Sequence, residues 1–258
     1  MLEDKISYHI IHSALNDFLG SLVSEVIIAG GGPSGLVAAS FLAEKKIKVV
    51  LLEKKFSLGG GIWGGGMMFP RIVLEKETKY ILDKFRIKFI VEEDLFIIDA
   101  IETAAKLTAG AIDRGVKIFN GITVEDVVIR KESLAGVVVN WTAVTQGGFH
   151  IDPIALSSKV VLDATGHPAE ISSIVAKKVG SLKTPSGKIA GEGSMWVEPA
   201  ETAVVKNAKE IFPGLYVAGM AANAVFGSPR MGPIFGGMFF SGEKSAELII
   251  EKLREKQE

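Results

Sequence analysis

Two short apolar runs near the start of the chain, at residues 26–29 and 49–52, enclose a segment with helical periodicity. The runs read Val-Ile-Ile-Ala and Val-Val-Leu-Leu, which is typical of strands buried on both faces of a sheet. Between them, apolar residues recur at helical spacing over residues 36–43. The pattern predicts a strand, a turn, a helix and a second strand.

The turn between the first strand and the helix contains three glycines that fit the pattern G-x-G-x-x-G. In such a unit Gly30 permits the tight turn, Gly32 lets the backbone approach a pyrophosphate, and Gly35 lets the helix lie close to the strand. The helix N-terminus near Ser34 presents free N–H groups to the phosphates. The motif predicts a dinucleotide-binding turn.

An acid in the expected place strengthens this interpretation. Glu53 ends the second apolar run, 18 residues after Gly35, where a carboxylate can accept hydrogen bonds from both ribose hydroxyls. A glycine turn without flanking strands and an acid would be weak evidence, because it occurs by coincidence.

The segment after Glu53, residues 57–71, is predicted to be a loop because it is rich in glycine. Residues 59–61 are all glycine and resemble the second glycine patch of flavoproteins with two dinucleotide-binding domains. The alternative is a flexible linker, but Trp63 and residues 67–69 are too apolar for a solvated one. A loop folded over a ligand is therefore the better interpretation.

Periodicity over the rest of the chain predicts further helices at residues 3–20, 74–86, 99–114 and 235–256, and strands at 116–119, 122–130, 134–144, 159–166 and 214–219. The segment 181–210 gives no clear prediction. Together these elements predict an α/β protein with a flavoprotein-like Rossmann fold: a parallel sheet with helices, plus an antiparallel β insertion at about residues 120–150. We expect residues 1–258 to form a single dinucleotide-binding domain with an N-terminal helix.

Composition narrows the possible functions. The net charge of −1 gives no reason to expect a nucleic acid or an anionic membrane surface as a partner. No apolar stretch is long enough to span a bilayer. The N-terminal residues include acids and histidines where a signal peptide needs a basic start and an apolar core. We therefore expect a cytoplasmic protein.

The chain contains no cysteine, which excludes disulfides, iron–sulfur clusters, thiolate zinc sites and thiol nucleophiles. It also excludes a mechanism in which the protein donates a cysteine sulfur. Any histidine chemistry must use one of four residues. His9 and His12 lie in the predicted N-terminal helix, outside every glycine motif, and are interpreted as surface or packed side chains. His150 and His167 remain.

The candidate chemistry centres on His150-x-Asp152 and on His167, which follows the predicted strand at residues 159–166. Both pieces are expected near the carboxyl ends of strands, where doubly wound sheets bind ligands. Imidazole and carboxylate suit Fe(II), Mn(II) or Zn(II). The alternative is that Asp152 caps a turn and His167 is a satisfied loop histidine, because two ligands alone do not make a motif.

Arg230 is a further candidate, since it lies in a proline- and glycine-containing loop that has no other charge. An arginine there can bind a small carboxylate in bidentate fashion. A structural salt bridge is the alternative.

Five segments together resemble the thiamine thiazole synthase family in its archaeal, sulfide-dependent form: GGGPSGL, GGGIWGGGMMF, HIDP, DATGH and GSPRMGPIFGGM. The resemblance extends from about residue 5 to residue 250. It implies an enzyme that binds NAD in a flavoprotein-like Rossmann fold and consumes it. Nicotinamide is lost, the resulting ADP-ribose isomerises to a ketose and condenses with glycine, sulfur enters, and the ring closes to an ADP-linked thiazole carboxylate.

The same resemblance implies where the sulfur comes from. In fungal and plant members a cysteine gives its own sulfur, whereas archaeal members have histidine there, need Fe(II), take free sulfide and turn over repeatedly. That histidine matches His150, to which we assign no proton-transfer role. The absence of cysteine agrees with this form.

The resemblance also carries roles to individual residues. Asp152 and His167 match the iron ligands, and Arg230 matches the residue that holds the glycine carboxylate. The family assembles as an octamer, so Asp152 could serve a neighbour's site. The nucleotide contacts fall on Ser34, Glu53, Lys54 and Gly61 for the pyrophosphate and ribose, on Val124 for the adenine, and on the backbone of Met220.

Two other functions are compatible with these motifs. One is an FAD-dependent oxidoreductase of the same fold, which would be yellow when purified. The other is a non-catalytic sensor that binds NAD or ADP-thiazole. It would keep nucleotide binding after Asp152→Ala, whereas an enzyme would lose synthesis.

Overall fold

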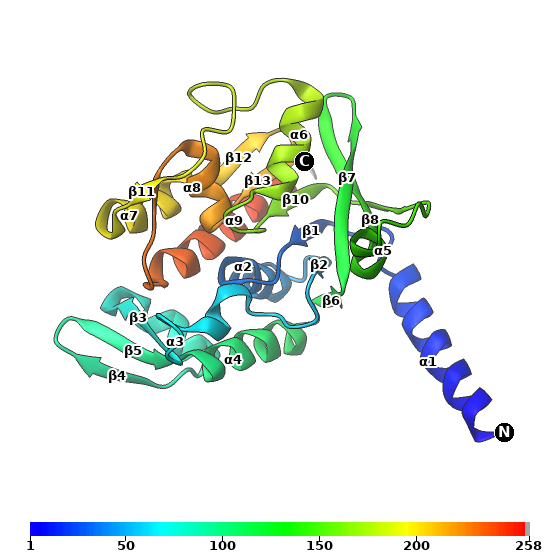
Figure 1. Ribbon diagram of the computed structural model, residues 1–258, viewed down its shortest axis with the longest axis horizontal. Coiled ribbons are helices and arrows are strands. Elements are labelled where there is room, and N and C mark those ends of the chain that lie inside the picture. The colour runs from blue at the N-terminus through cyan, green and yellow to red at the C-terminus, as the bar shows by residue number, and fades with distance from the viewer. Residues whose placement is uncertain (256–258) are drawn as a thin grey trace.

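The computed structural model describes residues 1–255, and a six-stranded sheet forms its centre (Figure 1). All neighbouring strands of this sheet run parallel except β12, which is antiparallel to β13. The order is β12 (Lys209–Phe212), β13 (Leu215–Val217), β10 (Val160–Asp163), β1 (Val26–Ala29), β2 (Val49–Glu53) and β6 (Lys117–Asn120). The predicted α/β fold with a parallel sheet is confirmed.

The three central strands β1, β2 and β10 are buried at every position, as the continuous apolar runs predicted. On one face Val26 and Ile28 pack with α2 (Pro33–Glu44), α4 (Ala100–Asp113) and α9 (Gly236–Glu255). On the other face Ile27 and Ala29 pack with α6 (Glu170–Val179), α8 (Met220–Phe226) and a second sheet. Because β1 has β2 on one side and β10 on the other, the crevice at its carboxyl end is the expected ligand site.

The second sheet is antiparallel and consists of β7 (Ile122–Arg130), β8 (Ser133–Trp141) and β9 (Ile154–Ser157). The predicted hairpin is present, but residues 142–144 begin the short helix α5 (Thr142–Gly147) instead of extending the strand. The third strand, β9, was not predicted. It begins at Ile154, directly after the segment that contains His150 and Asp152.

A third sheet of three antiparallel strands was not predicted at all: β3 (Arg71–Glu75), β5 (Leu95–Asp99) and β4 (Phe89–Glu92). The predicted helix over residues 74–86 is therefore wrong in its first part. Ile72 and Leu74 are buried while their neighbours are not, which is a strand pattern of period two. A 3-10 turn at Lys76–Thr78 then leads into α3 (Lys79–Phe85).

The remaining predicted helices are found with small shifts of their ends. α4 begins after Asp99, whose carboxylate accepts a hydrogen bond from the Glu102 N–H and caps the helix. α9 matches the predicted final helix, whose last residue, 256, lies outside the described residues. The predicted strands at 159–166 and 214–219 are shorter at both ends, since β10 covers Val160–Asp163 and β13 covers Leu215–Val217.

The N-terminal helix α1 (Leu2–Leu19) is present as predicted, but it extends away from the rest of the chain (Figure 1). It has no buried residue, and His9 and His12 are exposed on it. The unassigned segment 181–210 contains the strand β11 (Gly193–Met195) and the helix α7 (Val197–Asn207). Within the described part of the chain, no helix combines the length and the apolar character needed to cross a membrane.

Candidate functional site

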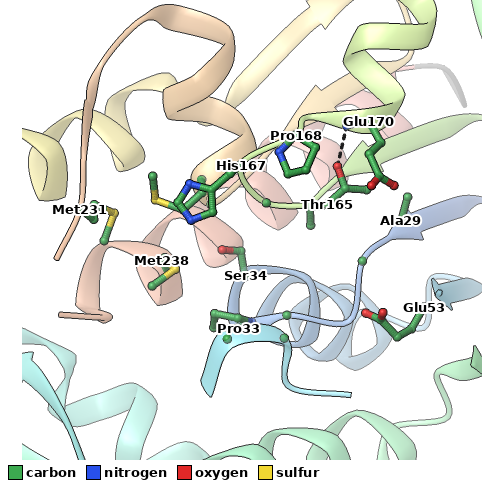
Figure 2. A pocket seen from close by; sticks show the side chains of 18 of the residues that line it. Ala29, Pro33, Ser34, Glu53, Thr165, His167, Pro168, Glu170, Met231 and Met238 are labelled. Atoms are coloured by element: carbon green, nitrogen blue, oxygen red, sulfur yellow. Dashed lines mark hydrogen bonds between the residues drawn. The ribbon is translucent and has the colours of Figure 1, made fainter. Parts of the chain in front are cut away.

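A cavity of about 630 Å³ opens at the carboxyl ends of β1, β2 and β10 (Figure 2). This volume is in the range of small-molecule and cofactor sites. The cavity is bordered by most of the residues that the sequence singled out: Gly30, Gly32, Ser34, Glu53, Lys54, Gly61, Val124, His167, Met220 and Arg230. Other lining residues were not predicted individually, among them Thr165, Pro168, Met231, Pro233 and Met238.

The three motif glycines have three different surroundings. Gly30 has a φ of +104°, and a Cβ on it would lie 2.3 Å from the carbonyl oxygen of Ala164. A Cβ on Gly35 would lie 2.0 Å from the carbonyl oxygen of Gly30, so Gly35 is required for close packing and lies outside the cavity lining. A Cβ on Gly32 would meet no atom within 4 Å, because Gly32 faces the cavity. The expected division of roles fits this geometry.

The N-terminus of α2 points its free N–H groups at the cavity. Gly32 is the N-cap and Pro33 the first helical residue, and no side chain among residues 1–255 caps the helix. Pro33 and Ser34 both border the cavity (Figure 2). An uncapped helix N-terminus that lines a cavity favours an anionic group such as a phosphate.

Glu53 is fixed at the end of β2 by two backbone donors. Its Oε2 accepts a hydrogen bond of 2.8 Å from the Gly31 N–H, and its Oε1 accepts one of 2.8 Å from the Lys55 N–H. The carboxylate is thus held beside the glycine turn, with lone pairs left for further donors. The neighbouring Lys54 forms an ion pair with Glu170, which also borders the cavity.

The turn that carries His167 is organised by Asp163, a fully buried residue at the end of β10. Its carboxylate accepts hydrogen bonds from the N–H and hydroxyl of Thr165, at 3.1 and 2.6 Å, and from the N–H and hydroxyl of Ser172, at 2.8 and 2.6 Å. Burial raises the pKa of Asp163, and the four donors oppose this rise. The Thr165 hydroxyl in turn accepts a hydrogen bond from the Glu170 N–H (Figure 2).

His167 itself is half exposed and has one polar partner in the described chain. Its Nδ1 lies 2.6 and 2.8 Å from the two carboxylate oxygens of Glu192. Glu192 comes from the segment that sequence patterns could not assign, and it was not predicted as a site residue. The ring lies at the cavity with Met231 and Met238 (Figure 2).

Arg230 belongs to a two-residue strand, β14 (Pro229–Arg230), that pairs in parallel with β11. Its backbone carbonyl accepts a hydrogen bond from the Trp196 N–H at 3.1 Å. No ion pair among residues 1–255 includes its guanidinium, so the structural salt bridge considered above is not found there. The side chain is exposed and borders the cavity, where it can meet an anion.

His150 and Asp152 lie elsewhere. Both are exposed and neither borders the cavity. We expected them near the carboxyl ends of strands, where doubly wound sheets bind ligands, but within this chain they do not lie at that edge of the parallel sheet, because the segment leads into β9 of the second sheet. Among the described residues, no three His, Cys, Asp or Glu side chains are grouped closely enough to hold a metal.

A second cavity, of about 450 Å³, is bordered by Glu75, Glu201 and Lys244 and contains none of the predicted site residues. Burial and the nearby Glu75 raise the pKa of Glu201 to about 8. The Glu201 carboxylate accepts a hydrogen bond of 2.5 Å from the N–H of Gly237 at the start of α9. Glu201 therefore binds the N-terminal turn of α9.

The parallel sheet, the glycine turn and the cavity at the end of β1 define a flavoprotein-like Rossmann fold. A model of the Thi4 family matches residues 7–235 of the chain. The thiamine thiazole synthase of Methanothermobacter thermautotrophicus is 49% identical over 252 residues, which cover 97% of this chain and 98% of that protein. The chain belongs to the Thi4 family.

Two further comparisons agree. The thiamine thiazole synthase of Pyrococcus furiosus is 49% identical over 255 residues, which cover 98% of this chain and 99% of that protein. The crystal structure of Thermovibrio ammonificans THI4 superposes with a TM-score of 0.96 at 42% identity and covers 98% of each chain. The similarity therefore includes nearly the whole length of the chain.

Proposed function

We propose that this protein is a thiamine thiazole synthase that makes an ADP-linked thiazole carboxylate from NAD, glycine and free sulfide, with Fe(II). The observation that carries the proposal is the cavity, at which a glycine turn and the N-terminus of α2 converge with Glu53 and with Arg230, an arginine that has no ion-pair partner among residues 1–255. Near-full-length relatives named thiamine thiazole synthase support the synthase activity.

The residues of the chain suit an NAD molecule held along the cavity. Gly32 and the N-terminus of α2 would receive the pyrophosphate, because backbone N–H groups and the helix dipole favour a negative charge there. Glu53 would accept the ribose hydroxyls. Val124 would contact the adenine and Met220 the nucleotide through its backbone.

The glycine substrate needs a cation for its carboxylate, and Arg230 is suited to that role. Its guanidinium borders the cavity and has no ion-pair partner in the described chain. A bidentate arginine–carboxylate pair would orient the amino group toward the sugar carbon it attacks.

His167 fits a metal ligand, because its Nδ1 is occupied by Glu192 and its Nε2 is left for a metal. When bound, Fe(II) supplies a Lewis acid and a positive charge that favours sulfide as HS⁻. Asp152 is remote from the cavity of its own chain and would fit only as a ligand from a second copy. We therefore propose a homo-oligomer, an octamer in line with the family resemblance, whose metal sites are shared between protomers.

The absence of cysteine requires an external sulfur source if the protein is this enzyme. Each chain could then turn over more than once, since no residue is consumed. By the family resemblance His150 matches the position of the sulfur-donating cysteine in other members. Because it does not border the cavity of its own chain, it would shape the pocket or contact the nucleotide only from a second copy.

The test is an anaerobic incubation of the protein with NAD, glycine, sulfide and Fe(II), followed by mass spectrometry. We expect the ADP-thiazole mass at more than one product per chain, and at least a 100-fold loss without iron or in His167→Ala, because a single metal ligand supports several kcal/mol of catalysis. His9→Ala, on the exposed N-terminal helix, is the matched control and should keep full activity.

Other outcomes would overturn the proposal. A bound yellow flavin with no product and no loss of NAD would favour an FAD-dependent oxidoreductase. NAD binding without turnover, unchanged by Asp152→Ala, would favour a sensor. Loss of NAD without sulfur incorporation would mean that the sugar steps are right and free sulfide is not the donor.

A further inference from the structure

The contact between His167 and Glu192 has a defined chemical consequence. A carboxylate is only an acceptor, so the Nδ1 atom that lies 2.6 and 2.8 Å from its two oxygens must carry the ring proton. In the neutral imidazole the lone pair is then on Nε2, because each ring nitrogen sets the state of the other. The contact therefore selects one of the two histidine tautomers.

Glu192 is itself held in place by its backbone neighbours. The N–H groups of Ala190 and Gly191 donate to the carbonyls of Val225 and Ala224, at 3.2 and 2.9 Å, and the Gly193 N–H donates to Ser228 at 3.0 Å. The first two acceptors lie in the last turn of α8, where helical carbonyls lack partners within the helix. The carboxylate thus extends from a fixed segment.

Glu192 does not border the cavity, and His167 does. In the described chain the carboxylate has no hydrogen-bond or ion-pair partner other than His167, and its side chain is only 16% exposed. A carboxylate that is mostly withdrawn from water and serves one imidazole has the geometry of an orienting group, since it acts on the ring and not on a bound molecule.

The contact also joins two parts of the site. His167 belongs to the turn fixed by Asp163, whereas Glu192 precedes β11, which pairs with the strand that carries Arg230. The hydrogen bond between His167 and Glu192 links these two segments.

We propose that Glu192 is a positioning residue that fixes the ring of His167 in the Nδ1–H tautomer and presents Nε2 to the cavity. The use of Nε2 as a metal ligand rests on the proposed function. The tautomer does not, because it follows from the contact alone and exists in the metal-free protein.

The first test reads the tautomer directly. Protein labelled with ¹⁵N-histidine is studied without metal at pH 8 by magic-angle-spinning NMR, which tolerates a large assembly. The four histidines are distinguished by substituting them singly. We expect His167 in the Nδ1–H form in the wild type, a loss of that preference in Glu192→Ala, and its partial retention in Glu192→Gln, whose amide oxygen can still accept a hydrogen bond from the Nδ1–H group.

The second test uses Co(II) as the metal probe and follows its visible absorption during titration. Loss of an orienting carboxylate typically weakens metal binding by roughly 10- to 100-fold. We expect that range for Glu192→Ala and a smaller loss for Glu192→Gln. Glu198→Gln and Glu198→Ala, which change an exposed acid six residues further along, are the matched controls and should bind Co(II) like the wild type.

The outcomes separate this inference from the proposed function. A wild-type His167 in the Nε2–H or doubly protonated form, or a tautomer unchanged in Glu192→Ala, would overturn the positioning role. The expected tautomer together with no Co(II) binding by the wild type would instead support the positioning of the ring and overturn the proposed metal site. Equal Co(II) affinity in wild type and Glu192→Ala would show that the orientation does not serve a metal.

Discussion

The two segments that carry the predicted metal ligands are built in opposite ways. The turn from Asp163 to Ser172, which carries His167, is anchored by a buried carboxylate with four donors. The segment with His150 and Asp152 is exposed, and the main-chain carbonyl of Ile151 accepts a hydrogen bond of 3.2 Å from Asn140. One predicted ligand, His167, lies on a turn held by its own chain, whereas the other, Asp152, is exposed.

This difference suggests that one part of the proposed site is fixed before a ligand binds and that the other is fixed by a covering partner. A turn with every polar group satisfied holds a side chain in one geometry before any ligand arrives. An exposed segment obtains its geometry only when something covers it. Phe149 and Ile151 flank His150 and are 69% and 54% exposed, so apolar surface is available there for a partner to cover. The comparison can be tested from both sides.

The largest effect is expected from removing the anchor of the rigid segment. Asp163→Ala leaves the part-buried N–H of Thr165 and the buried N–H of Ser172 without acceptors, at a cost of about 3–5 kcal/mol in the free energy of unfolding. For a chain of this size that corresponds to a drop of roughly 10 °C in Tm. Thermal and urea unfolding would measure it.

Asp163→Asn is the matched variant, because it keeps the volume of the side chain. Its amide oxygen can accept from one pair of donors, but its NH₂ group faces the other pair, so it should recover only part of the loss. Unfolding of Asp163→Ala at the wild-type temperature would contradict the role of Asp163 as the anchor.

The contrast also separates what the sequence could predict from what it could not. The strands β1, β2 and β10 are buried on both faces, and the glycine turn between β1 and α2 is a local steric requirement, so apolar runs and glycine spacing identified them. The sheet of β3, β5 and β4 was missed, since β4 is largely exposed and has no apolar alternation to read.

The site residues can also be divided into those that the sequence could predict and those that it could not. The residues next to the glycine turn and at the end of β10 line the cavity because neighbouring parallel strands bring their carboxyl ends together. Glu192 had no signal, because its contact with His167 depends on how residues 190–193 pair with α8 and β14. The placement of His150 and Asp152 failed for a similar reason: β9 joins the second sheet, which local periodicity could not indicate.

The second largest effect is expected in activity. It tests whether Asp152 on the exposed segment completes the site of a neighbouring protomer. Asp152→Ala and His167→Ala protomers should each be inactive alone, because each removes one proposed ligand from every site. Mixed at equal amounts by co-expression, they should regain about a quarter of the wild-type activity. In a symmetric assembly with shared sites, that fraction of sites receives both intact residues.

The control is a mixture of His167→Ala with the double variant Asp152→Ala/His167→Ala, in which no site can receive both residues. It should stay inactive at the same expression level. Failure of the first mixture to recover activity, with mixed oligomers demonstrated by differential tags, would mean that the two residues do not meet across an interface.

The smallest effect is expected in the stability of Asp152→Ala. In the described chain the Asp152 carboxylate takes part in no hydrogen bond or ion pair and is exposed, so its removal should change the free energy of unfolding by less than about 0.5 kcal/mol. Added metal should distinguish the stability of the wild type from that of Asp152→Ala, because a ligand at 100 times its Kd stabilises a protein by about 2.7 kcal/mol. Added Co(II) should therefore raise the Tm of the wild type but not that of Asp152→Ala. A clear loss of stability in the metal-free variant would mean that Asp152 already contributes to the fold or to a subunit contact. The segment with Asp152 would then be held by contacts before any metal binds, as the turn with His167 is.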